Sequence, residues 1–173
     1  MKSIRIGLVL ATVMVFAILQ GPAMAEEKAK EPIDKIEANV KEMVKQAKGS
    51  INQIAVAEFK AVSDKQETFF ELIDVRISDE YQAGHIPGAM NISRNVLEFV
   101  TPKKIKDPNV QIYVYCKSGG RGALATKRLS DMGYTNVVNI TEGFGGWVKA
   151  GNPARNQHGE FYFKPDGFGK KED

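Results

Sequence analysis

The sequence predicts an α/β domain in which a parallel β-sheet is flanked by helices on its faces. From Ile54 onward, short apolar runs alternate with segments of helical spacing. Glycines follow the ends of the last two helical segments, and no internal repeat divides the chain. Alternation of strands and helices is typical of parallel sheets. The chain is therefore expected to hold one such unit.

Short apolar runs bounded by turn residues define the expected strands. They lie at residues 54–56, 69–75, 89–92, 111–115 and 137–140, of which the first is the least distinct. Helices are predicted between and after them, at 57–62, 78–83, 96–100, 121–132 and 143–150. Gly133 and Gly151 stand where left-handed caps would end the last two helices. The tail after residue 151 has no clear period, so its structure stays open.

The first 25 residues have the layout of a cleaved secretory signal. Lys2 and Arg5 form a short positive region, residues 6–19 are almost entirely apolar, and Ala23 and Ala25 occupy the positions that a signal peptidase reads. An uncleaved membrane anchor is the alternative, but an anchor needs about 20 apolar residues. The sequence therefore predicts cleavage after Ala25, a periplasmic or secreted product and no stable membrane insertion after cleavage.

Residues 26–50 are predicted to extend the domain at its N-terminus with an amphipathic helix. Residues 26–31 are charged, and from Pro32 the apolar side chains recur at helical spacing. Proline suits the first helical position, and Gly49 suits a C-terminal cap. Packing against the domain is one interpretation, and a membrane-surface or partner-binding helix is another. The polar face mixes lysines and glutamates, which does not favour binding to anionic lipid.

The charge balance of the mature chain gives no indication of nucleic-acid binding. Removing residues 1–25 takes away Lys2 and Arg5 but no acidic residue, so the formal net charge falls from +3 to +1. No basic block with interleaved aromatic residues is present. The remaining 148 residues suffice for one well-buried domain, expected at residues 51–153, with a C-terminal tail at 154–173.

Cys116 is the only cysteine, so an exported product cannot form an internal disulfide and carries one thiol. Free cysteines are often buried and inert, and composition alone does not separate that interpretation from a reactive thiol. The flanking residues favour reactivity. Cys116 ends the strand at 111–115 and opens a loop that runs into a helix, and ligand sites of parallel α/β sheets form at such edges.

The loop after this strand is expected to stabilise an anionic sulfur. Its glycines allow the backbone to curl and to turn several N–H groups inward, and the following helix adds its positive end. Two basic side chains add full charges. The predicted catalytic residue is Cys116, as the thiolate nucleophile, and the predicted substrate-binding residues are Lys117, Ser118, Gly119, Gly120, Arg121 and Gly122.

The sequence resembles the rhodanese family over residues 54–153. The resemblance rests on separated motifs that occur in the family's order: residues 72–76, 80–81, 84–89, the loop from Cys116 to Arg121, and 142–147. It implies a rhodanese-like fold with about five parallel strands and an enzyme that moves sulfane sulfur from thiosulfate or a persulfide to cyanide or a thiol. It implies neither a metal nor an organic cofactor. A protein could also be the sulfur acceptor.

Three other polar residues invite catalytic roles that the sequence does not favour. In the family, the turn that contains His85 is structural, and a loop of backbone amides needs no base to hold a thiolate. Asp74 and Arg76 are expected to form an internal ion pair or turn cap rather than an acid and base. His158 is expected in solvent, and a metal site is not predicted. Trp147 and Phe144 are expected to pack behind the loop.

Two other functions use similar residues. Cysteine phosphatases and arsenate reductases place an arginine six residues after the cysteine, whereas Arg121 follows Cys116 by five. The shorter loop suits a sulfur atom better than a tetrahedral oxyanion. A non-enzymatic persulfide carrier, or a sulfur-binding partner protein in an exported sulfur-metabolism system, uses the same chemistry as the enzyme. The sequence does not distinguish these two, and it does not give the oligomeric state.

Overall fold

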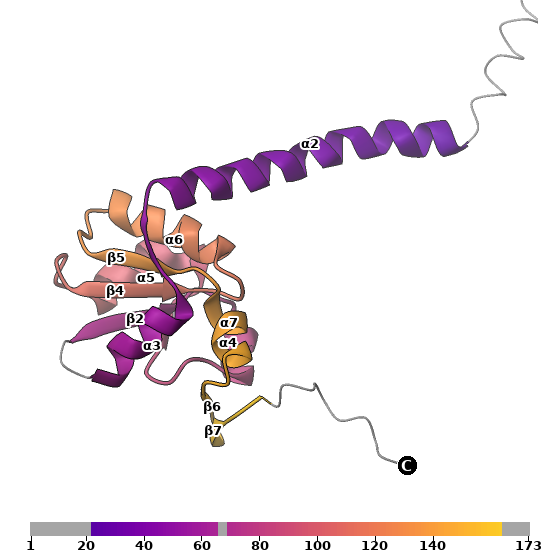
Figure 1. Cartoon of the computed structure of the whole chain (residues 1–173). Helices are drawn as coiled ribbons and strands as arrows, with labels where there is room; N and C mark the ends of the chain where they lie inside the picture. Colours follow the sequence, from indigo (N-terminus) through magenta and orange to yellow (C-terminus); the bar gives the residue numbers. More distant parts are fainter. Residues whose placement is uncertain (1–21, 66–68, 164–173) are drawn as a thin grey trace, which may run out of the picture. The chain divides into compact units, whose positions relative to one another are not determined.

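The computed structural model describes residues 22–65 and 69–163, and side chains from Pro32 onward. Most of the predicted signal peptide, residues 1–21, lies outside the described residues. The chain divides into two units between Glu42 and Met43. Helix α2, Pro22–Gly49, belongs to both (Figure 1), and the second unit contains every strand of the described part of the chain. No helix in the described part of the chain combines the length and hydrophobicity that a membrane span requires.

Helix α2 begins ten residues before the predicted start, and Pro32 lies inside it. The expectation that Pro32 occupies the first helical position is therefore wrong. A proline inside a helix removes one backbone hydrogen bond, but its fixed φ is compatible with a helix. Alanine, glutamate and lysine surround it, and these residues favour helices strongly enough to continue through the proline. The predicted end at Gly49 is confirmed.

A five-stranded parallel sheet in the order β1-β5-β4-β2-β3 forms the centre of the second unit. The strands are β1 (Asn52–Ile54), β2 (Phe70–Asp74), β3 (Met90–Asn91), β4 (Gln111–Tyr115) and β5 (Val137–Ile140). This confirms the predicted fold class. Strand β1 lies two residues before its predicted position, because the chain pairs with β5 as soon as α2 has ended.

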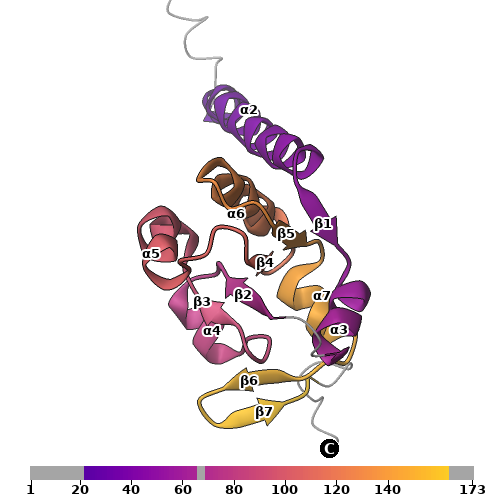
Figure 2. The ribbon, with the colours of Figure 1, turned by 90° about the vertical axis from the view of Figure 1, so that its left-hand side faces the viewer.

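Helices cover both faces of the sheet, as Figure 2 shows. Helices α5 (Leu97–Lys104) and α6 (Gly120–Asp131) lie on one face, and α3 (Val56–Lys65) and α7 (Gly143–Lys149) lie on the other. Two further short helices, α4 (Ser78–Ala83) and η1 (Arg94–Val96), follow β2 and β3. Gly133 and Gly151 have positive φ just after α6 and α7, as predicted.

Alternate residues of β4 supply two separate apolar cores. Ile112, Val114 and Cys116 belong to the core under α5 and α6, whereas Tyr113 and Tyr115 belong to the core under α3 and α7. Successive side chains of a strand point to opposite faces, and both faces are covered here. Cys116 therefore leaves the sheet on the side of α6.

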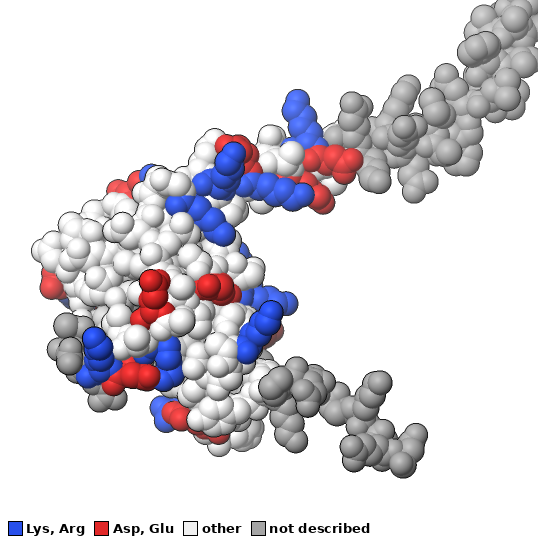
Figure 3. Space-filling model, viewed as in Figure 1, with Lys and Arg blue, Asp and Glu red and all other residues white. Residues whose placement is uncertain are grey.

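The tail, whose structure the sequence left open, forms a hairpin of β6 (Ala154–Asn156) and β7 (Gly159–Phe161). Backbone hydrogen bonds in both directions join Arg155 to His85, with N···O distances of 3.0 and 2.9 Å. The hairpin thus secures the turn that contains His85. Acidic and basic side chains are interspersed on the face drawn in Figure 3.

Candidate active site

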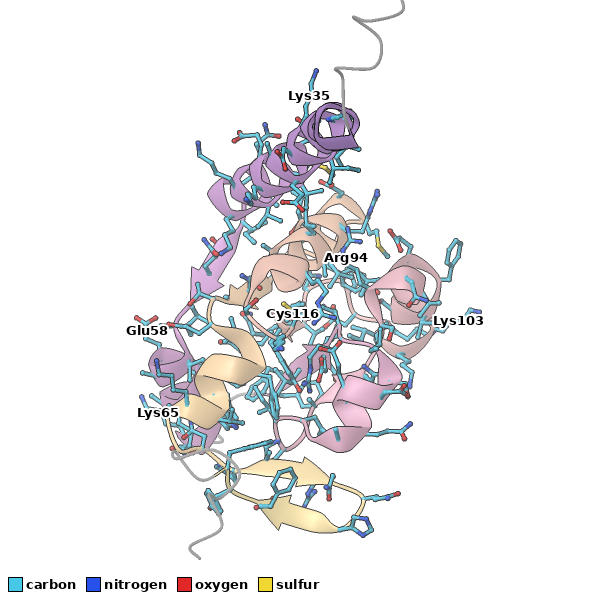
Figure 4. The ribbon with its side chains drawn as sticks, turned by 90° about the vertical axis from the view of Figure 1, so that its right-hand side faces the viewer. Lys35, Glu58, Lys65, Arg94, Lys103 and Cys116 are labelled. Carbon is cyan, nitrogen blue, oxygen red and sulfur yellow. The ribbon has the colours of Figure 1, made fainter. Side chains whose placement is uncertain are left out.

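Cys116 lies at the carboxyl edge of the sheet, directly after β4, in the loop that leads into α6 (Figure 4). Only 1% of its surface is exposed, whereas Lys117 and Ser118 are exposed. The sulfur therefore belongs to the base of the loop and the next two side chains belong to its rim. Burial alone would also suit an inert cysteine, so the surrounding backbone decides what this residue can do.

The start of α7 holds the carbonyl groups of the loop. The Phe144 N–H donates to the Cys116 carbonyl at 2.7 Å, and the Gly145 N–H donates to the Lys117 carbonyl at 2.8 Å. Both carbonyls are thereby turned toward α7. In α6, the Ala123 N–H is the first to bond within the helix, to the Gly119 carbonyl at 2.9 Å.

The backbone N–H groups of residues 117–122 have no acceptor among the described residues. Three belong to the loop, and three belong to the first turn of α6, where a helix leaves its amides unsatisfied. Six consecutive donors thus follow Cys116. These unused N–H groups are the donors that a negative charge on this sulfur, or on a second sulfur bound to it, can use.

Three glycines allow β5 and the start of α7 to pack closely against the loop after Cys116. A Cβ on Gly119, which has φ +86°, would lie 1.8 Å from the Thr141 carbonyl oxygen. A Cβ on Gly122 would lie 2.4 Å from Asn139 Oδ1. Gly143, with φ +58°, would place a Cβ 2.3 Å from the Cys116 carbonyl oxygen. The glycines of the loop therefore act through the backbone, by letting β5 and α7 approach it.

Arg121 is bound to Glu80 of α4, an interaction for which the sequence holds no local signal. Nη1 lies 2.7 Å from Glu80 Oε2, and Nη2 lies 2.9 Å from Oε1. Hydrogen bonding from Arg121 holds the pKa of Glu80 below its ordinary value, and the same bond raises the pKa of Arg121. One of the two predicted anion-binding side chains is thus already neutralised. Lys117 makes no ion pair with any described residue.

Asp74 and Arg76 form the predicted ion pair beneath the site. The Arg76 Nη2 lies 2.6 Å from Asp74 Oδ2 and also donates to the Gly84 carbonyl at 2.7 Å. Asp74 is fully buried, and Arg76 is 4% exposed. The guanidinium also lies over the Phe144 ring, 4.2 Å from its centroid. The pair joins β2 to the turn before β3 and to the start of α7.

His85 has the structural surroundings that the sequence favoured. Its Nδ1 lies 3.0 Å from the Tyr81 carbonyl oxygen, and its ring stacks on the Tyr81 ring at 3.8 Å. Trp147 is 2% exposed and donates from Nε1 to the Pro153 carbonyl, which confirms its core position. His158 is exposed, as expected. No cluster of metal-binding side chains occurs in the part of the chain that the structure describes.

Two polar residues near the loop were missed as site residues, in addition to Glu80. The Arg94 N–H donates to the Val75 carbonyl, and the Val75 N–H donates to the Tyr115 carbonyl. Exposed Arg94 therefore lies at the same sheet edge as Cys116 (Figure 4). Asn139 is fully buried in β5, and its Oδ1 has no donor within the described residues. An asparagine within an apolar strand was the available signal for the second.

Comparison with known proteins agrees with this geometry. The family model described as "Rhodanese-like domain" matches residues 55–150, more than half of the chain. The Bacillus subtilis protein named "Putative sulfur carrier protein YrkF" is 32% identical over 57% of this chain and 52% of its own length. Thiosulfate sulfurtransferase PspE of Escherichia coli is 39% identical over 39% of this chain and 64% of its own length. The chain thus spans between half and two thirds of these relatives.

A solved structure from Rhodopseudomonas palustris has a similar fold. It is 33% identical, with a TM-score of 0.60, and the match covers 66% of this chain and 92% of that protein. That protein is described as one of unknown function and a possible tyrosine phosphatase. The description thus gives that protein a function that the spacing from Cys116 to Arg121 does not favour here.

Proposed function

Because the chain belongs to the rhodanese-like domain family, we propose that it is a sulfurtransferase that carries sulfane sulfur as a persulfide on Cys116. One observation carries the proposal: the only thiol of the chain begins a loop whose next six backbone N–H groups have no acceptor among the described residues. Such a row of donors stabilises a negatively charged sulfur.

The proposed loading step is an exchange of sulfur–sulfur bonds. The Cys116 thiolate attacks the outer sulfur of thiosulfate, the bond between the two thiosulfate sulfurs breaks, and sulfite leaves with the electron pair. The product on the protein is the anion Cys116–S–S⁻. In the second step, cyanide or a thiolate attacks the outer sulfur, and Cys116 leaves as the thiolate. Charge balances in both steps, and neither step needs an oxidant or a reductant.

The burial of Cys116 is compatible with this chemistry. A sulfur–sulfur bond is about 2.05 Å long, so a persulfide extends the reactive atom from the base of the loop toward its rim. The outer sulfur also carries the negative charge, and it is this atom that the loop amides would bind. Lys117, exposed at the rim, supplies a positive charge for incoming sulfur anions.

The test is catalytic turnover. Purified protein is incubated with thiosulfate and cyanide, and thiocyanate is measured over time. We expect many equivalents of thiocyanate per protein, and none from a Cys116→Ser variant that unfolds at the same urea concentration as the wild type. Equal thiocyanate production by the serine variant would show that Cys116 is not the nucleophile.

A dedicated sulfur carrier is the second candidate, favoured by the Bacillus subtilis relative that is named as one. A carrier forms the same persulfide but keeps it until a specific protein acceptor arrives. It would therefore release one equivalent of sulfur or less to cyanide or small thiols within the period in which an enzyme turns over repeatedly. The amplitude of the thiocyanate measurement separates the two.

A phosphatase is less compatible with the site. Catalysis of phosphoryl transfer by a cysteine loop needs an arginine that forks onto two phosphate oxygens. Both terminal nitrogens of Arg121 are bonded to the Glu80 carboxylate. We therefore expect no hydrolysis of aryl phosphates, and robust hydrolysis without sulfur loading would favour the phosphatase.

We also propose that the protein is exported and cleaved after Ala25, on the residue pattern of the first 25 positions. After cleavage there, α2 would start at Glu26 and would still contain more than five helical turns. N-terminal sequencing of protein from its native source should return Glu26. Recovery of Met1 instead would favour a retained membrane anchor.

A further inference from the structure

Glu80 is the carboxylate bound to Arg121, the last residue of the active-site loop. The two side chains meet through paired hydrogen bonds of 2.7 and 2.9 Å. Glu80 lies on α4, which follows β2, and Arg121 lies in the first turn of α6, which follows β4. The two residues therefore come from the connections after two neighbouring strands, at the same edge of the sheet. The Glu80 side chain is 28% exposed and the Arg121 side chain 41% exposed, so the pair lies at the surface of the site.

The pair changes the charge that a sulfur donor meets. Arg121 is one of the two basic side chains of the loop, and its charge is balanced by Glu80 in the resting protein. Within the described residues, the exposed basic side chains left without an ion pair at this edge are those of Lys117 and Arg94. Each additional negative charge on a donor is therefore attracted less strongly than it would be if Arg121 were unbalanced.

We propose that Glu80 sets the charge selectivity of the site by neutralising Arg121, so that singly charged sulfur donors compete effectively with doubly charged ones. This inference rests on the proposed sulfurtransferase function. Glu80 acts through Arg121 and need not touch the donor, so it is a positioning and charge-balancing residue. The donors concerned are sulfane-sulfur anions, which differ in charge between thiosulfate and organic thiosulfonates.

Two donors of matched chemistry test the proposal. Thiosulfate carries two negative charges, and methanethiosulfonate carries one, with a methyl group in place of one oxygen. Both present the same outer sulfur to Cys116, and the leaving groups are sulfite and methanesulfinate. The measured quantity is the ratio of kcat/KM for thiosulfate to that for methanethiosulfonate, at low ionic strength.

Glu80→Gln should raise this ratio about two- to fivefold over the wild type. The estimate takes Coulomb's law for one unit charge roughly 7 Å away, at an effective dielectric constant between about 40 and 80, reduced by residual screening. The increase should arise mainly from a lower KM for thiosulfate, and it should shrink as salt is added. The glutamine oxygen still accepts a hydrogen bond from Arg121, so the loop keeps one of its two contacts.

Two further variants separate charge from structure. Glu80→Asp keeps the negative charge but shortens the side chain, so a charge effect predicts the wild-type ratio even where the paired geometry is lost. Glu98→Gln is the matched control, because Glu98 pairs with Arg128 of the same helix α6 at 3.0 Å, two turns farther along. This control should keep the wild-type ratio.

An unchanged ratio in Glu80→Gln, or the same change in Glu80→Asp, would overturn the proposal. Failure of the proposed function is recognised separately, since the wild-type protein would then load sulfur from neither donor. Urea unfolding of each variant shows that the compared proteins are folded. A ratio that rises in the glutamine variant alone and falls back with added salt supports the proposal.

Discussion

Gly143→Ala tests the most demanding feature of the site, the contact between the start of α7 and the carbonyl of Cys116. Gly143 has φ +58°, and a Cβ there would lie 2.3 Å from the Cys116 oxygen and 3.0 Å from the carbonyl carbons of Cys116 and Lys117. The substitution should therefore both strain the backbone and push the loop away from α7.

The magnitude follows from two costs. An alanine in the left-handed region costs roughly 1–2 kcal/mol. Overpacking a close contact adds typically 1–3 kcal/mol. We expect a loss of about 2–5 kcal/mol in the free energy of unfolding, within what a domain stabilised by about 5–15 kcal/mol can survive. The kcat/KM for sulfur transfer should fall by more than the loss of folded protein explains, because the hydrogen bonds that turn the loop carbonyls toward α7 are disturbed.

Gly151→Ala is the matched control. Gly151 also has positive φ, +77°, but no atom lies within 4 Å of a Cβ built there. It should lose only the conformational cost of about 1–2 kcal/mol and keep its activity. Urea denaturation and kcat/KM with thiosulfate are measured for both variants. Equal losses of stability, together with wild-type activity in Gly143→Ala, would refute the role assigned to this contact.

Three other predictions follow from the ion pairs and from the rim of the loop. Asp74→Asn leaves the buried Arg76 guanidinium without its carboxylate, and should cost about 3–5 kcal/mol in urea unfolding; a loss below 1 kcal/mol would contradict it. Arg121 lowers the pKa of Glu80, so their pair stabilises the fold above the ordinary value of 4.5, and this contribution disappears as pH falls through the lowered folded-state pKa. Glu80→Gln should therefore cost about 0.2–1 kcal/mol at pH 7 but nothing in strong acid, as pH-dependent unfolding can show. Lys117→Ala should raise KM for thiosulfate at low salt with little change in kcat, and an unchanged KM would mean that the loop amides suffice for binding.

The sheet could be predicted from the sequence because its strands are short apolar runs with both faces covered. β4 and β5 have the predicted bounds, since buried parallel strands contrast sharply with the polar turns around them. Helix α4 has its predicted bounds as well. The predicted start of α2 was wrong because a proline is a weaker barrier within a strongly helical segment than at its edge.

The hairpin of the tail could not be predicted, because its two strands have three residues each and bond to a distant turn at His85. Hydrogen bonds between backbone groups far apart in sequence leave no periodic pattern. The same limit applies to Glu80. Local sequence places it on a short helix, but its partner Arg121 lies 41 residues away and is brought near only by the sheet. Cys116 could be proposed from the sequence because its strand, glycines and basic neighbours are contiguous.

Intact-protein mass spectrometry after incubation with thiosulfate tests the central claim most directly. The wild-type protein should gain the mass of one sulfur atom, located at Cys116 by fragmentation, and should lose it when cyanide or a thiol is added. Cys116→Ser should gain nothing. A wild-type protein that acquires no sulfur, or a serine variant that acquires as much, would contradict the assignment of the persulfide to Cys116.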